Sequence, residues 1–111
     1  MQLWTTNFFA SHRAFFKVVT NTAHTQVAVM NLKKGEVSGE YGTDHPHADQ
    51  IVMVISGEGK AKVDGKSHQL HAGDTLLIEA GEKHQIRGES DEVFQSVNFY
   101  SPIAYPNEMD V

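Results

Sequence analysis

The sequence predicts an all-β protein with a single barrel or sandwich. Short segments rich in β-branched and aromatic residues alternate with glycine-containing turns. No window longer than about ten residues combines a helical period with caps. The 111 residues and a hydrophobic content of 40% suit one compact core. One domain is therefore expected over residues 1–111, with an arm at 1–13, a barrel at 14–100 and an irregular tail at 101–111.

The expected strands follow one another closely along the chain. They cover residues 15–20, 25–32, 51–55, 59–63, 66–70, 75–78, 84–87 and 93–100. Aromatic and β-branched residues mark the first of them, and the run Ile51 to Ile55 is apolar throughout, as in a buried strand. Asp64-Gly65 favours a tight hairpin turn between two strands. The apolar groups of the arm indicate packing on the domain or on a partner subunit.

Charge and composition exclude several classes of partner. A net charge of −5 gives no reason to expect nucleic acid or an anionic membrane surface. The absence of cysteine fits a reducing compartment. The N-terminus lacks a basic leader, and no apolar run approaches the roughly 18–20 residues of a membrane helix. A soluble, cytoplasmic protein is expected.

Two histidine-bearing stretches carry the predicted chemistry. His45 and His47 are one residue apart and would share a face if their segment were a strand. Gln50 opens the apolar run that follows, and His84 follows a second glycine-bounded strand. Imidazoles that two strands direct into one barrel form a transition-metal site. The predicted metal ligands are His45, His47, Gln50 and His84.

Strand alternation from these ligands predicts a mostly apolar cavity. Residues in phase with them are Val52, Val54, Ile86, Thr43 and Tyr41. Tyr41 is the one among them whose side chain could act as an acid, so it is the candidate catalytic residue. Such a cavity favours small, partly hydrophobic organic molecules.

The same residues resemble the two sequence motifs of the cupin family. Gly39, His45, His47, Gln50 and Gly57 answer to the first motif, and Gly73, Gly81 and His84 to the second. The resemblance extends over roughly residues 14 to 102 and implies a small single-domain cupin, a jelly-roll β-barrel. It also implies a homodimer, because small cupins usually pair.

Gln50 stands where the family usually has glutamate. Two alternatives to the predicted set of ligands stay open. Counting back from Gly57 with the longer family spacing would pair Thr43 with His45 and leave His47 in the loop. Gln50 could also hydrogen-bond a ligand histidine instead of binding the metal. As a ligand, the neutral amide would leave the centre at +2 instead of +1, which should strengthen its Lewis acidity.

The function expected from these features is metal-dependent. The cofactor is one divalent transition metal per chain, chosen among Mn, Fe, Ni, Zn, Co and Cu. We expect an enzyme on a small organic molecule, either a dioxygenase or a lyase or isomerase. The alternative is a non-catalytic module that binds a small molecule or a metal. A sugar-binding sensor of transcription is disfavoured because no helix-turn-helix segment is present.

Overall fold

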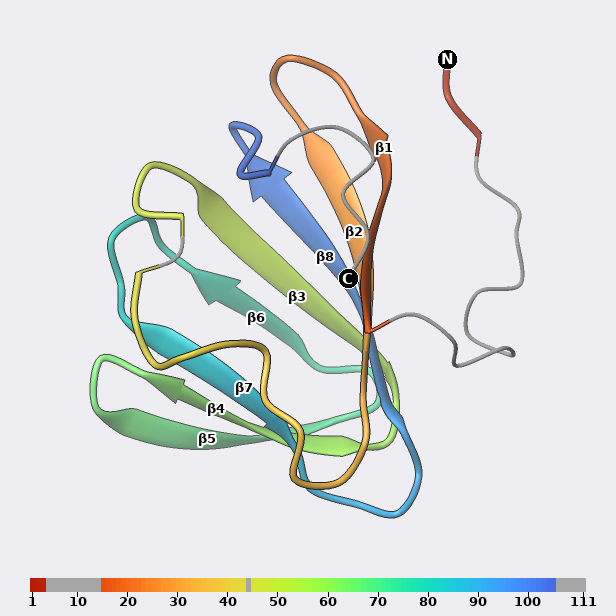
Figure 1. The fold of residues 1–111 in the computed structure, drawn as a ribbon, viewed down its shortest axis with the longest axis vertical. Helices are drawn as coiled ribbons and strands as arrows, with labels where there is room; N and C mark the ends of the chain where they lie inside the picture. Colours follow the sequence, from red (N-terminus) through yellow and green to blue (C-terminus); the bar gives the residue numbers. More distant parts are fainter. Residues whose placement is uncertain (4–14, 44, 106–111) are drawn as a thin grey trace.

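Eight β-strands and no helix form the part of the chain that the structure, a computed structural model, describes: residues 1–3, 15–43 and 45–105 (Figure 1). The strands are β1 (Phe16–Asn21), β2 (Gln26–Leu32), β3 (Asp49–Ser56), β4 (Glu58–Val63), β5 (Lys66–His71), β6 (Thr75–Ile78), β7 (His84–Gly88) and β8 (Phe94–Ser101). This confirms the predicted all-β class. The expected arm lies mostly, and the expected tail partly, outside the described residues.

The strands form two antiparallel sheets. The larger sheet has the order β1-β2-β8-β3-β6, and the smaller has the order β5-β4-β7. The last strand of the chain, β8, lies between β2 and β3 and pairs with both along its length (Figure 1). Long-range pairing of β8 therefore joins the N-terminal strands to the middle of the chain. None of the described residues forms a helix that could span a lipid bilayer.

The core lies on the inner face of the larger sheet, as the alternation of side chains along β3 requires. Val52 and Val54 of this strand are buried, whereas Ile51 and Met53 are exposed on the opposite face. The buried apolar cluster consists of Phe16, Val18, Ala28, Met30, Leu32, Val52, Val54, Ala61, Leu70, Ile78, Ile86, Phe94 and Tyr100. Both sheets contribute to it, so their inner faces pack on each other.

The hairpin of β4 and β5 turns at the expected residues. Val63 pairs with Lys66, and the two residues between them have positive φ angles, 45° at Asp64 and 83° at Gly65. Two central residues in this region form the turn whose twist matches that of the flanking strands. The Asp-Gly prediction is confirmed.

The condition under which His45 and His47 would share a strand face is not met. Residues 45–48 form a turn before β3 instead of a strand, with the carbonyl oxygen of His45 accepting a hydrogen bond from the amide of Ala48 at 3.1 Å. Pro46 occupies the second position of this turn, where its fixed φ is favourable. His45 and His47 therefore do not share a strand face: His45 is buried and His47 is exposed.

Candidate metal and ligand site

The structure brings three of the four predicted metal ligands together. His45 Nε2 lies 2.8 Å from Gln50 Oε1, and the ring centroids of His45 and His84 are 4.7 Å apart with planes inclined by 42°. All three side chains are buried. They come from the turn before β3, from β3 itself and from the first residue of β7, so both sheets contribute to one cluster.

Backbone pairing places each of these side chains. Gln50 faces the core because it is in phase with Val52, and it lies between Ile78 of β6 and Tyr100 of β8 in the larger sheet. His84 exchanges backbone hydrogen bonds with Gly42, of 3.0 and 3.3 Å, which brings the segment before the turn against the start of β7. The cluster is therefore positioned by regular sheet pairing and by one isolated bridge.

Backbone carbonyls orient both imidazole rings. His45 Nδ1 donates to the carbonyl oxygen of Ala48 at 3.3 Å, and His84 Nδ1 donates to that of Glu82 at 3.1 Å. A carbonyl oxygen can only accept, so each contact requires a proton on Nδ1. In the neutral ring this leaves the lone pair on Nε2, the tautomer that a metal-binding histidine needs.

Side-chain amides orient Gln50 in turn. Its Nε2 donates to Asn98 Oδ1 at 2.9 Å, and Asn98 Nδ2 donates to Ser96 Oγ at 3.0 Å. Asn98 and Ser96 are in phase on β8 and fully buried. This chain of donors directs the carbonyl oxygen of Gln50 at His45.

The donor set fits a divalent cation. The lone pair of His45 Nε2 and the carbonyl oxygen of Gln50 are both acceptors, and at 2.8 Å they repel each other unless a proton or a metal cation lies beside both. Neighbouring ligand atoms of one metal ion are separated by about 3 Å. Two imidazoles and one amide oxygen are ligands that first-row transition metals accept. Among the described residues, however, no three His, Cys, Asp or Glu side chains form a group that could hold a metal ion.

Two of the predicted site residues lie away from this cluster. His47 is exposed in the turn, and its Nε2 lies 3.1 Å from the carbonyl oxygen of Ile103. The hydroxyl of Tyr41 accepts a hydrogen bond from the amide of Gly65 at 2.7 Å, at the tip of the β4–β5 hairpin. The turn at Pro46 explains the position of His47. The roles assigned to both residues stay predictions.

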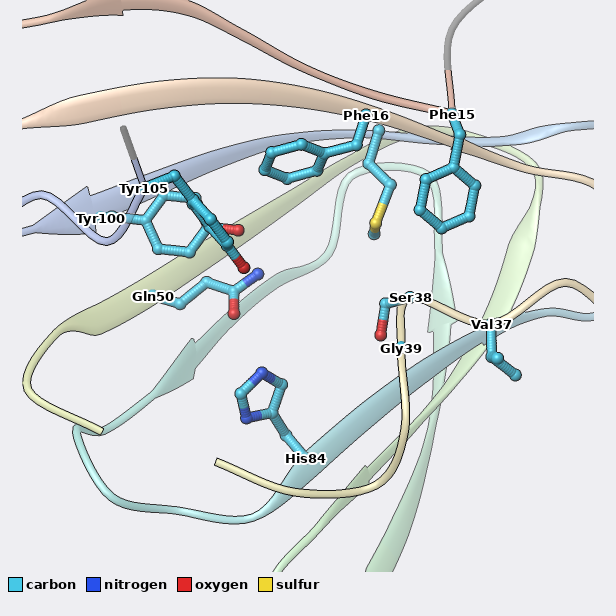
Figure 2. A pocket seen from close by; sticks show the side chains of 10 residues that line it. Phe15, Phe16, Val37, Ser38, Gly39, Gln50, His84, Tyr100 and Tyr105 are labelled. Atoms are coloured by element: carbon cyan, nitrogen blue, oxygen red, sulfur yellow. The ribbon is translucent and has the colours of Figure 1, made fainter. Parts of the chain in front are cut away.

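A cavity of about 490 Å³ adjoins the cluster (Figure 2). Its lining residues come from β1, β2, the segment 37–39, both sheets beside the cluster and the C-terminal segment: Phe15, Phe16, Met30, Val37, Ser38, Gly39, Gln50, His84, Tyr100 and Tyr105. The expected wall residues Val52, Val54 and Ile86 belong to the packed core instead. Of the four predicted ligands, Gln50 and His84 line this cavity.

Sequence reasoning missed several of the residues that shape the site. Alternation along β8 could have found Asn98 and Tyr100, because they are in phase with each other and face the core. Tyr105 carried no such signal, since it follows the last strand. Its ring lies 5.2 Å from that of Tyr100 and 6.2 Å from that of His45, measured between centroids.

A buried glutamine holds Tyr105 in place. Gln26 of β2 is fully buried, and its Oε1 accepts hydrogen bonds from the amides of Ala104 and Tyr105 at 3.1 and 3.0 Å. Its Nε2 donates to the carbonyl oxygen of Tyr105 at 2.7 Å. The contact between His47 and Ile103 adds a second attachment. The segment after β8 is therefore a wall of the cavity.

Comparison with known proteins identifies the same fold. A family model described as Cupin domain matches residues 28–100. The curated polyketide synthase CurC of Streptomyces cyaneus is 32% identical over 73 residues, which are 66% of this chain and 46% of that protein. The chain thus spans about half the length of this relative.

Solved structures share the architecture. BH2720 from Bacillus halodurans superposes with a TM-score of 0.84 at 24% identity, covering 98% of this chain and 88% of that one. A Cupin 2 conserved barrel domain protein from Salinispora arenicola gives 0.72 at 21% identity, with 91% and 88% covered. At these identities the likeness shows the fold alone, and it confirms the predicted jelly-roll barrel.

Proposed function

Because this chain belongs to the cupin domain family, we propose that it binds one divalent transition metal and a small organic molecule, and that it acts as a metal-dependent enzyme. The observation that supports this most strongly is the convergence of His45, Gln50 and His84 beside the cavity. The candidate metals are Mn, Fe, Ni, Zn, Co and Cu. A bound ion would supply Lewis acidity, and without a carboxylate ligand it would keep its full charge.

The residues of this chain prepare the site for that chemistry. The carbonyls of Ala48 and Glu82 hold the imidazoles in one tautomer, and Asn98 holds the oxygen of Gln50. Preorganised ligands lose little freedom when an ion or substrate binds. The apolar groups that line much of the cavity would lower the local dielectric constant, so electrostatic interactions there would be stronger than in bulk water.

The reaction is a dioxygenation, or a lyase or isomerase step. Among the described lining residues there is no Lys, Arg, Asp or Glu. Proton transfer would therefore fall to the phenol groups of Tyr100 and Tyr105. The same observation favours the second candidate function, a non-catalytic module that binds the small molecule or the metal.

The curated relative suggests a chemical class for the proposed substrate. That protein is a polyketide synthase by name, and a polyketide is a carbon skeleton with keto or hydroxyl oxygens. Carried to this chain as a proposal, it indicates a substrate whose oxygens approach the cluster. The metal and the apolar cavity suit such a molecule.

Metal content tests the proposal directly. Protein purified without an affinity tag or chelator is expected to contain close to one divalent ion per chain by elemental analysis. Iron or manganese would direct substrate screens to oxygen-dependent reactions, and zinc or nickel to lyase and isomerase reactions. Protein that contains no metal and takes up none on addition would overturn the enzyme proposal.

The Gln50→Glu variant is expected to bind Mn²⁺ more tightly than the parent, by roughly tenfold or about 1.4 kcal/mol, because a carboxylate adds charge to the ligand set. Isothermal titration with Mn²⁺ measures the change. Gln69→Glu, at an exposed position of β5, is the matched control for the added charge. Equal or weaker binding by Gln50→Glu would show that residue 50 does not contact the ion.

We also propose a homodimer formed through the outer face of the larger sheet. Four apolar side chains are exposed there, with 38% of Ile51, 41% of Met53, 44% of Ile55 and 55% of Leu77 accessible. Sheet pairing sets Ile51 beside Leu77 in one row. A flat apolar face can pack on its own copy as two sheets pack in a sandwich. Nucleic acid and membranes are not proposed as partners, given the net charge of −5.

The Met53→Lys variant is expected to shift the protein from dimer to monomer, because a charge would be buried in the apolar interface. Light scattering after size exclusion should give twice the chain mass of 12.3 kDa for the parent and one chain mass for the variant. Gln69→Lys on β5 is the control and should stay dimeric. A monomeric parent would contradict the proposal.

A further inference from the structure

Much of the cavity wall is aromatic, from Tyr100 and Tyr105 beside Gln50 to Phe15 and Phe16 farther from the metal ligands. Four lining residues, Phe15, Phe16, Tyr100 and Tyr105, carry aromatic rings. The Tyr105 ring contacts those of Phe16 and Tyr100 edge to face, with centroid distances of 5.1 and 5.2 Å and plane angles of 62° and 84°. Such contacts hold the rings in position before a ligand enters. The aromatic wall is thus preorganised, and Gln26 keeps Tyr105 within it.

No charged side chain lies among the described residues that line the cavity. The described lining residues other than the aromatic rings and the two ligands are Met30, Val37, Ser38 and Gly39, which are uncharged. A carboxylate, sulfonate or phosphate entering here would lose water without gaining a cationic side chain. A sugar would leave most of its hydroxyls unpaired against Met30 and the phenylalanines. Both classes are therefore disfavoured as groups packed against this wall.

The cavity has one polar end and one apolar end. Figure 2 shows Gln50 and His84 across the space from Phe15 and Phe16. A ligand that fills both ends needs an apolar ring system on one side and oxygens on the other. The volume of about 490 Å³ lies in the range of cavities that take drug-sized molecules.

We infer that the cavity binds a flat, uncharged aromatic molecule that carries neighbouring hydroxyl or keto oxygens on one edge. The rings would pack against Phe16 and Tyr105, and the oxygens would face Gln50 and His84. The inference deepens the proposed function and rests on it for the metal-directed oxygens. The ring contacts depend only on the wall.

Paired titrations separate the contribution of the ring contacts from that of the metal. The probe is naphthalenediol with hydroxyls on neighbouring carbons, and its control is the saturated decalindiol. Calorimetry on metal-free protein should show the aromatic diol binding at least about tenfold more tightly, because several ring contacts are lost with the saturated one. Zn²⁺-loaded protein should bind it more tightly still. Naphthalene sulfonate, which is charged, should bind more weakly than the diol to the metal-free protein.

Variants locate the binding. Tyr105→Leu should weaken naphthalenediol binding by about 3- to 10-fold, whereas Tyr105→Phe, which keeps the ring, should stay close to the parent. Val37→Trp, at a partly exposed lining position, should block entry even if Tyr105→Leu fails to fold. Gln69→Ala, at an exposed position of β5, is the control and should leave naphthalenediol binding unchanged.

The outcomes distinguish the two proposals. Protein that takes up Zn²⁺ but binds both diols equally overturns the aromatic inference and keeps the metal. Protein that binds naphthalenediol in the cavity but takes up no metal keeps the aromatic inference and overturns the metal-dependent function. Tight binding that Val37→Trp and Tyr105→Leu both leave intact would place the probe elsewhere and overturn the inference.

Discussion

Replacing His84 with alanine is expected to lower metal affinity by about 100-fold or more, because it removes one of two imidazoles from the cluster. Three ligand side chains converge there among the residues that the structure describes, so each would carry a large share of the binding free energy. Titration with Mn²⁺ or Zn²⁺ and elemental analysis of the purified variant measure the loss. The side chain faces the cavity, so the fold should survive its truncation.

Two further histidine variants make this result specific. His47→Ala should retain metal, because its imidazole is exposed and contacts the carbonyl oxygen of Ile103 instead of the cluster. Loss of metal in that variant would restore the four-ligand set that the sequence predicts. His68→Ala, at an exposed position of β5, controls for the removal of any imidazole. Unchanged metal content in His84→Ala would contradict the site.

Replacing Gln26 with alanine is expected to destabilise the protein by on the order of 2–4 kcal/mol. The fully buried side chain makes three hydrogen bonds to the backbone of Ala104 and Tyr105. Its removal leaves those backbone groups unpaired and opens a gap between β2 and the C-terminal segment. Denaturant unfolding measures the loss of stability, and hydrogen exchange at the amides of Ala104 and Tyr105 measures the release of the segment.

The control is an equally conservative change on the surface. Gln69→Ala removes an exposed glutamine from β5 and should alter stability by less than about 0.5 kcal/mol. A Gln26→Ala protein with parental stability and unchanged exchange at residues 104 and 105 would show that the segment is held by other contacts. Faster exchange at residues 104 and 105, together with weaker binding of aromatic probes, would show that the hydrogen bonds of Gln26 support the cavity wall.

The proposed metal site and the proposed binding of an aromatic molecule both depend on the division of the cavity into a polar and an apolar end. His84 and Gln50 belong to the polar end, whereas the ring contact between Tyr105 and Phe16 provides the surface for ring packing. His84→Ala should therefore weaken metal binding more than binding of an aromatic molecule. Gln26→Ala should weaken binding of an aromatic molecule more than metal binding.

Local sequence patterns determined the strands and their turns. The alternation along β3 and the Asp64-Gly65 hairpin depend on residues a few positions apart, so they could be predicted without any knowledge of the tertiary fold. The inward direction of Gln50 follows from the same alternation. Its proximity to His84 was expected from the motif resemblance, and the pairing of the sheets accounts for it.

Only the tertiary structure decided the surroundings of the ligands. Tyr105 reaches the cavity because Gln26, 79 residues earlier, binds its backbone, and Asn98 meets Gln50 because β8 pairs with β3. His47 lies away from the cluster because residues 45–48 form a turn at Pro46 and not a strand. Such contacts depend on the register of distant segments, which periodicity within one strand does not specify. The sequence alone therefore determined the strands and three converging candidate ligands, whereas packing between distant segments determined the aromatic cavity beside them.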